Sequence, residues 1–191
     1  MIPSRFASML LSGCLLLSAA SFAQPNPEPK IDDDFLQKQF GTNCTLIGMP
    51  ALKADLDGDG VEDLVIPAHC TSPLMNQAEN SYVVLDPYNS FFGYGNPKVT
   101  TAFVADDPMR RGFSILVIHG LGTEAWHSDH PKAKFMLVNI PFRDVKVRKL
   151  LVRKKVVTAI YFEETGGDGM TSVAFWDGKK YKYQPMGSSM E

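Results

Sequence analysis

The chain consists mostly of short apolar segments separated by glycine, proline, asparagine and aspartate. These segments are rich in β-branched and aromatic residues, and no helical pattern between them is long enough to connect parallel strands. The predicted strands are 44–47, 51–54, 63–68, 81–86, 98–104, 113–118, 134–139, 145–152, 156–163, 171–177 and 180–184. We therefore expect a mainly β fold with largely antiparallel sheets, and α+β is the alternative class.

One short helix is predicted, just before the first strand. In residues 31–41, three aspartates at 32–34 suit the N-terminus of a helix, and Gly41 suits its C-terminus. Phe35, Leu36 and Phe40 would share one face of this helix. That face can pack against a sheet.

The first 23 residues have the pattern of a secretory signal peptide. Arg5 precedes an apolar stretch at 9–20, and small residues precede a cleavage point after Ala23. The stretch has about 12 residues, whereas a membrane-spanning helix needs roughly 20. We expect a periplasmic or secreted protein with no transmembrane segment in the mature chain. In the alternative interpretation, Cys14 carries a lipid anchor.

Three regions follow from this division: a signal peptide at 1–23, a proline-rich spacer at 24–30 and a single mainly β domain at 31–191. The whole chain has a net charge of −2. This value disfavours a nucleic-acid partner, because such proteins carry an excess of positive charge.

Two cysteines, Cys44 and Cys70, remain after the leader. In an exported protein such a pair indicates a disulfide, and the alternative is two buried thiols.

Residues 55–63 form the strongest chemical motif of the chain. Aspartates occupy positions 1, 3, 5 and 9 of this loop, a glycine at position 6 allows a sharp bend, and position 7 offers a backbone carbonyl. Calcium prefers six to eight such oxygen ligands. The twelfth position is Ile66 and not glutamate, so the motif is not an EF-hand. The alternative is a tight turn capped by solvated aspartates.

The segment ADLDGDGVEDLVI resembles the calcium loop of FG-GAP or VCBS-type repeats, which occur in β-propellers of integrins and of exported bacterial proteins. The resemblance implies a calcium cofactor and a set of coordinating residues. These residues are Asp55, Asp57, Asp59, Val61 and Asp63. A single repeat cannot build a full propeller, because each blade takes some 40 to 60 residues.

The strands on either side of the loop are predicted to form a hairpin. Pairing across the loop gives partner numbers that add up to about 118, whereas Cys44 and Cys70 add up to 114. A bulge or a kink at 48–50 can absorb this offset of four positions. The disulfide would then close the open end of the hairpin, and calcium its tip.

A second group of polar residues lies between 119 and 130. His127 and His130 are three positions apart and have carboxylates nearby, so they could bind a transition metal, but a surface loop is the better interpretation. The candidate ligand or metal residues here are His119, Glu124, Trp126, His127 and His130.

These patterns predict an exported, calcium-stabilised β domain that acts as a non-catalytic binding or envelope-associated module. Its ligand would be a protein or, through the basic strands between 143 and 155, an anionic glycan. The alternative is a metal-dependent enzyme that uses His119, His127 and His130. No catalytic residue is nominated.

Overall fold

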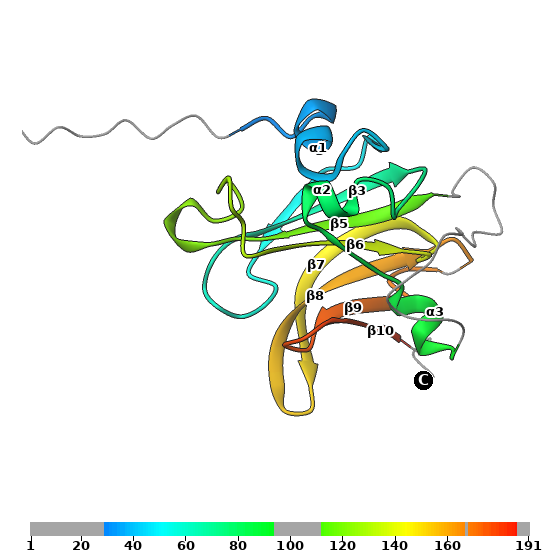
Figure 1. Ribbon diagram of the computed structural model, residues 1–191. Coiled ribbons are helices and arrows are strands. Elements are labelled where there is room, and N and C mark those ends of the chain that lie inside the picture. Colours follow the sequence, from blue (N-terminus) through cyan, green and yellow to red (C-terminus); the bar gives the residue numbers. More distant parts are fainter. Residues whose placement is uncertain (1–28, 94–111, 167, 187–191) are drawn as a thin grey trace, which may run out of the picture.

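A computed structural model describes residues 29–93, 112–166 and 168–186 of the protein. The fold is mainly β, which confirms the prediction, and its strands form two sheets that pack on one another (Figure 1). The predicted strand at 98–104 and the predicted leader at 1–23 lie outside the described residues.

The first sheet contains six strands in the order β1-β3-β5-β6-β4, and β2 also pairs with β3. Their bounds are β1 Cys44–Leu46, β2 Leu52–Ala54, β3 Asp63–Cys70, β4 Val83–Leu85, β5 Phe113–His119 and β6 Ala133–Val138. All pairs are antiparallel except β4 with β6, which the sequence did not predict. Since the chain reverses direction between β4 and β5, and both border β6, one of the two must run parallel to it.

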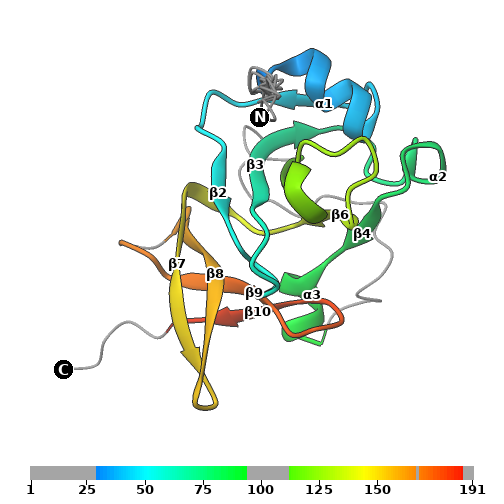
Figure 2. The same cartoon turned by 90° about the vertical axis from the view of Figure 1, so that its left-hand side faces the viewer.

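The second sheet is a series of hairpins in the order β10-β9-β8-β7. Its strands are β7 Phe142–Val152, β8 Lys155–Glu164, β9 Ser172–Trp176 and β10 Tyr181–Pro185. The β7–β8 hairpin extends beyond the other strands and ends in a free tip (Figure 2). Leu151 and Val156 near this tip are 70% and 67% exposed, so the end of the hairpin contributes little to the core.

Helix α1, Asp33–Phe40, confirms the predicted N-terminal helix. The Asp32 side chain accepts a hydrogen bond from the Phe35 backbone N–H at 3.0 Å and caps the helix. Two further short helices were not predicted, α2 at Gln77–Asn80 and α3 at Pro87–Phe91. Among the helices of the described residues, none has the length and apolar content needed to cross a bilayer.

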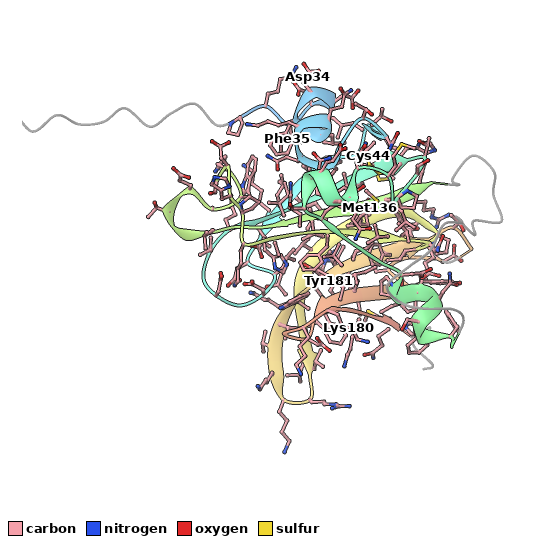
Figure 3. All side chains as sticks on the ribbon, in the orientation of Figure 1. Asp34, Phe35, Cys44, Met136, Lys180 and Tyr181 are labelled. Atoms are coloured by element: carbon pink, nitrogen blue, oxygen red, sulfur yellow. A yellow bond between two sulfur atoms is a disulfide. The ribbon has the colours of Figure 1, made fainter. Side chains whose placement is uncertain are left out.

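Both faces of the first sheet are buried. Leu64 and Ile66 of β3 pack on one face with Leu36 of α1, while Val65 packs on the other face with Ile160 of the second sheet. Figure 3 shows side chains filling the space between the two sheets. This double burial explains why β3 and β5 are continuous apolar runs and do not alternate with polar residues.

Cys44 and Cys70 form a disulfide and are directly paired across β1 and β3. The predicted pairing is therefore confirmed. Partner numbers add up to 114 along β1 and to 117 along β2, so the chain between these strands absorbs an offset of three positions, one fewer than predicted. The disulfide and the 55–63 loop thus lie near opposite ends of β3.

Candidate metal centre

The acidic loop connects β2 to β3 at the edge of the first sheet. Ala54 pairs with Asp63, so the two strands meet directly below the loop and fix its ends. Asp63 is the first residue of β3 and is fully buried. The loop is therefore a strand–loop–strand hairpin tip, as the sequence predicted.

Backbone N–H groups wrap around the first aspartate of the loop. Asp55 accepts hydrogen bonds from Gly58 and Asp59 on one oxygen, at 2.7 and 3.2 Å, and from Gly60 on the other, at 3.1 Å. Gly60 has a φ of 84°, which a residue with a side chain rarely adopts. The sharp bend predicted at Gly60 is present, and it holds the loop in a curve around its aspartates.

Carboxylate oxygens of Asp55, Asp57 and Asp63 lie within 4.8 Å of one another. Calcium–oxygen bonds are 2.3–2.6 Å, so two oxygens on opposite sides of one ion stand roughly 4.6–5.2 Å apart. The three carboxylates therefore match the size of a calcium ion. Among the described residues, this is the group of potential ligands that lies close enough together to hold a metal.

Asp63 is held from two directions. One of its oxygens accepts from the Leu56 N–H at 2.7 Å and the other from the Gly120 N–H at 2.8 Å. Burial raises the pKa of Asp63 to about 6, even though both hydrogen bonds favour its charged form. A nearby cation would offset the cost of this buried charge.

Gly120 allows the end of β5 to approach the loop closely. A Cβ atom at this position would lie 2.4 Å from the Glu62 carbonyl oxygen and 2.8 Å from a Val61 methyl group. Any side chain would push β5 away and break the hydrogen bond to Asp63.

Asp59 points to a different partner. The ammonium group of Lys132 lies 2.6 Å from one oxygen of Asp57 and 2.6 Å from one oxygen of Asp59. Lys132 thereby lowers the pKa of Asp59 and neutralises part of the loop from within the chain. Asp59, a predicted ligand, is thus drawn to a lysine and lies outside the converging group.

The remaining predicted ligand is Val61, at position 7. Its N–H donates to Asp59 at 2.9 Å, and coordination through its carbonyl stays a prediction.

His119 connects the loop to the second sheet. Its Nδ1 atom lies 3.4 Å from an oxygen of Asp57, and its Nε2 atom lies 2.7 Å from the hydroxyl of Tyr181. Burial lowers the pKa of His119 to about 4, so the ring is neutral near pH 7. A neutral ring can donate from Nδ1 toward Asp57 and accept from Tyr181, which satisfies all three groups.

The other residues predicted between 119 and 130 do not gather around a common centre. Glu124, His127 and His130 are exposed, whereas Trp126 is buried and donates from Nε1 to Glu62 at 3.1 Å. Trp126 therefore packs in the core. From this set, His119 lies beside the loop's aspartates, and Trp126 contacts the loop through Glu62.

The basic segment between 143 and 155 forms the β7–β8 hairpin. Arg143 pairs with Glu163, Lys146 lies 3.0 Å from Asp144, and Lys149 donates to Thr158. Two of the seven basic residues in this segment, Arg143 and Lys146, are thus paired with carboxylates. An anionic glycan as ligand of this hairpin stays a prediction.

A comparison with protein-family models, with curated proteins and with solved structures found no match.

Proposed function

We propose that this protein is an exported β module whose 55–63 loop binds one calcium ion, and that it acts by binding a ligand and not by catalysis. The observation that carries the proposal is the convergence of the Asp55, Asp57 and Asp63 oxygens within 4.8 Å. The resemblance of the loop to FG-GAP or VCBS-type repeats supports the same conclusion, and adds Asp59 and the Val61 carbonyl as ligands.

The donor chemistry favours calcium over other metals. All side-chain donors in the group are carboxylate oxygens, which hard cations prefer, whereas zinc sites usually include histidine or cysteine. Magnesium demands a near-ideal octahedron and retains its waters. A loop of aspartates without a fixed octahedral arrangement suits the more tolerant calcium, at the affinity of about 10⁻⁴–10⁻³ M that is common in extracellular modules.

Lys132 would leave when calcium binds. Its ammonium group now neutralises Asp57 and Asp59, and its side chain is 42% exposed, so it can move into solvent. Calcium brings two charges to the loop in place of one. It also allows Asp59 to turn toward the other carboxylates.

Export is supported by the Cys44–Cys70 disulfide, because such bonds persist in oxidising compartments. Both sulfur-bearing residues are buried, so the bond belongs to the folded core. The leader predicted at 1–23 agrees with this compartment.

A binding role is favoured over the enzyme alternative because the histidines named for catalysis do not converge. His119 is buried against Tyr181, while His127 and His130 are exposed. The acidic loop therefore has a structural role: calcium stabilises the module that presents a ligand site elsewhere.

The test is a set of melting curves in 10 mM calcium, in 10 mM magnesium and in chelator. At ten times the dissociation constant, calcium adds about 1.4 kcal/mol, which corresponds to a rise of roughly 3–6 °C for a domain of this size. Asp57→Ala combined with Asp59→Ala should abolish the rise. The control pair Asp34→Ala and Glu79→Ala removes two exposed carboxylates outside the loop and should retain it. Identical wild-type curves in calcium and in chelator would refute the proposal.

A further inference from the structure

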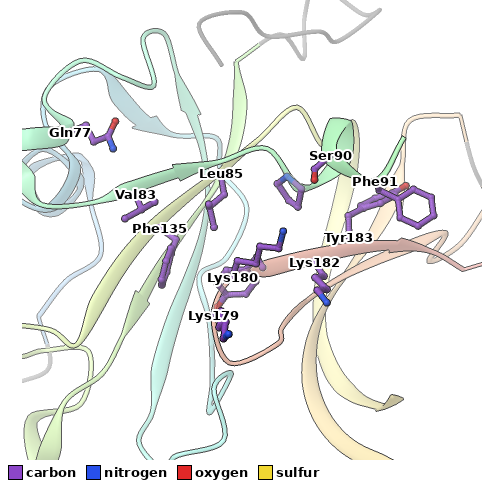
Figure 4. A pocket seen from close by; sticks show the side chains of 12 residues that line it. Gln77, Val83, Leu85, Ser90, Phe91, Phe135, Lys179, Lys180, Lys182 and Tyr183 are labelled. Carbon is purple, nitrogen blue, oxygen red and sulfur yellow. The ribbon is translucent and has the colours of Figure 1, made fainter. Parts of the chain in front are cut away.

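A cavity of about 690 Å³ lies between α3, β4, β6 and the β9–β10 hairpin (Figure 4). Its volume falls in the range of about 300–1,000 Å³ that is typical of small-molecule sites. It is separate from the acidic loop, and no residue predicted from the sequence as a ligand or metal site lines it.

The floor of the cavity is apolar and buried. It is formed by Leu85, Phe135 and Tyr181, which are 7%, 7% and 3% exposed. The Tyr181 hydroxyl is already paired with His119, so the ring offers its apolar surface to the cavity. The floor therefore favours an apolar group and has no unpaired hydroxyl to bind a sugar.

The rim leaves large apolar side chains in water. Val83 is 44% exposed and Phe91 is 50% exposed, and both line the cavity. Phe91 also packs its ring against Tyr183 at 5.6 Å. A ligand with an apolar body would cover this surface, and each Å² removed from water is favourable.

The charges around the cavity have a single sign. Lys179, Lys180 and Lys182 line it, and none of its described lining residues carries a negative charge. Figure 4 shows the Lys180 side chain reaching across the opening toward Ser90 on α3.

Two of these lysines have no ionic partner. Asp177 pairs with Lys182 at 2.9 Å, and its other oxygen accepts the backbone N–H groups of Lys179 and Lys180. The carboxylate in the turn is thus fully engaged. Within the part of the chain that the structure describes, the ammonium groups of Lys179 and Lys180 form no ion pair.

We propose that this cavity binds a small amphipathic organic anion, with its aromatic or aliphatic body against Leu85, Phe91 and Phe135 and its carboxylate or sulfonate between Lys179 and Lys180. An apolar floor combined with unpaired cations selects against neutral polar molecules, which would lose hydrogen bonds to water. It also selects against cations. The volume of the cavity fits a small molecule and not a polymer.

The experiment compares two fluorescent probes that differ in charge. The anionic probe is 8-anilinonaphthalene-1-sulfonate, and the neutral probe is N-phenyl-1-naphthylamine, which has the same ring system without the sulfonate. We expect one saturable site for the anionic probe on the wild type. Lys179→Glu combined with Lys180→Glu should weaken the anionic probe at least tenfold and change the neutral probe less than threefold.

Two control variants make the result specific. Lys154→Glu combined with Lys155→Glu makes the same charge change at the tip of the β7–β8 hairpin, where both residues are exposed, and should leave both probes unaffected. Val83→Trp fills the cavity and should weaken both probes at least tenfold, whereas Val156→Trp, at a more exposed strand position that does not line the cavity, should weaken neither.

Several outcomes overturn the proposal. If the anionic probe binds the wild type without saturation, the cavity is not a site. If the Lys179 and Lys180 variant weakens both probes equally, the lysines act by packing and not by charge. If the control variant at Lys154 and Lys155 has the same effect, only the net charge of the protein matters.

Discussion

The acidic loop and the cavity differ in how their charges are compensated. In the loop, backbone N–H groups surround Asp55 and Asp63, and Lys132 neutralises Asp57 and Asp59. At the cavity, Lys179 and Lys180 have no ionic partner among the described residues. The loop already holds an internal cation that an external one could replace, whereas the cavity presents two solvent-exposed lysines that could pair with an external anion.

The two regions also differ in what holds them in place. The loop lies on β3, whose far end is fixed by the disulfide, while the cavity depends on β10 and α3, which the disulfide does not reach. His119 connects the two regions, because it lies beside Asp57 on the loop and beside Tyr181 in the cavity wall. Changes to one region should therefore leave the other largely intact.

Removing the disulfide should have the largest effect. The bond closes a separation of 26 residues, so Cys44→Ala combined with Cys70→Ala should lower the free energy of unfolding by about 3–4 kcal/mol, measured by urea denaturation. Loss of the disulfide should also lower the affinity of the loop for calcium, while the anionic probe should still bind the folded fraction. If the variant loses probe binding but keeps its calcium affinity, the disulfide supports the cavity and not the loop, which contradicts the proposal.

The pH dependence of stability should reveal the buried carboxylate. Without calcium, Asp63 holds its proton up to about pH 6 in the folded protein, whereas the unfolded chain releases it near 3.8. The free energy of unfolding should therefore fall, by up to about 3 kcal/mol, as the pH rises through this window.

The matched variant for this prediction is Asp63→Asn, which is neutral throughout. The difference in unfolding free energy between the wild type and this variant, measured in calcium-free buffer, should decline between pH 4 and 6. A difference that stays constant would show that Asp63 titrates normally.

Replacing the internal cation should tighten calcium binding. Lys132→Met removes the group that competes for Asp57 and Asp59, so the dissociation constant for calcium should fall about tenfold, or about 1.4 kcal/mol, by calorimetric titration. The exposed lysine Lys38, which pairs with Asp129 outside the loop, provides the control Lys38→Met. Unchanged or weaker calcium binding by Lys132→Met would contradict the competition.

The smallest effect is expected when calcium bound at the loop acts on the affinity of the cavity for the anionic probe. Because His119 and Tyr181 are buried and already paired with each other, saturating calcium should change the affinity of the anionic probe less than about twofold. A change of tenfold in a fluorescence titration would show that the two regions act as one coupled site.

Much of the fold could be predicted from local sequence patterns. Apolar segments bounded by glycine and proline located the described strands to within a few residues, and Asp32 and Gly41 located α1. The parallel pairing of β4 with β6 could not be predicted, because it depends on strand order and not on any local pattern. Strand β4 ends one residue earlier than the predicted strand at 81–86, because Asp86 caps helix α3, which begins at Pro87.

The two candidate sites also differ in how far local sequence patterns predict them. The acidic loop is a local motif, so its spacing already indicated the aspartates and the bend at Gly60. Lys132 is 73 residues from Asp59, and the Gly120 N–H reaches Asp63 across 57 residues, so only the folded chain brings them together. The cavity likewise combines α3, β6 and β10, and no single segment carries its pattern.

The central claim is that the 55–63 loop exchanges Lys132 for calcium, and a crystal structure grown in calcium tests it directly. We expect one ion with oxygens of Asp55, Asp57, Asp59 and Asp63 and the Val61 carbonyl at 2.3–2.6 Å, and with the Lys132 ammonium group displaced into solvent. Lys132 still bridging Asp57 and Asp59 at saturating calcium, with no ion between the carboxylates, would contradict the claim.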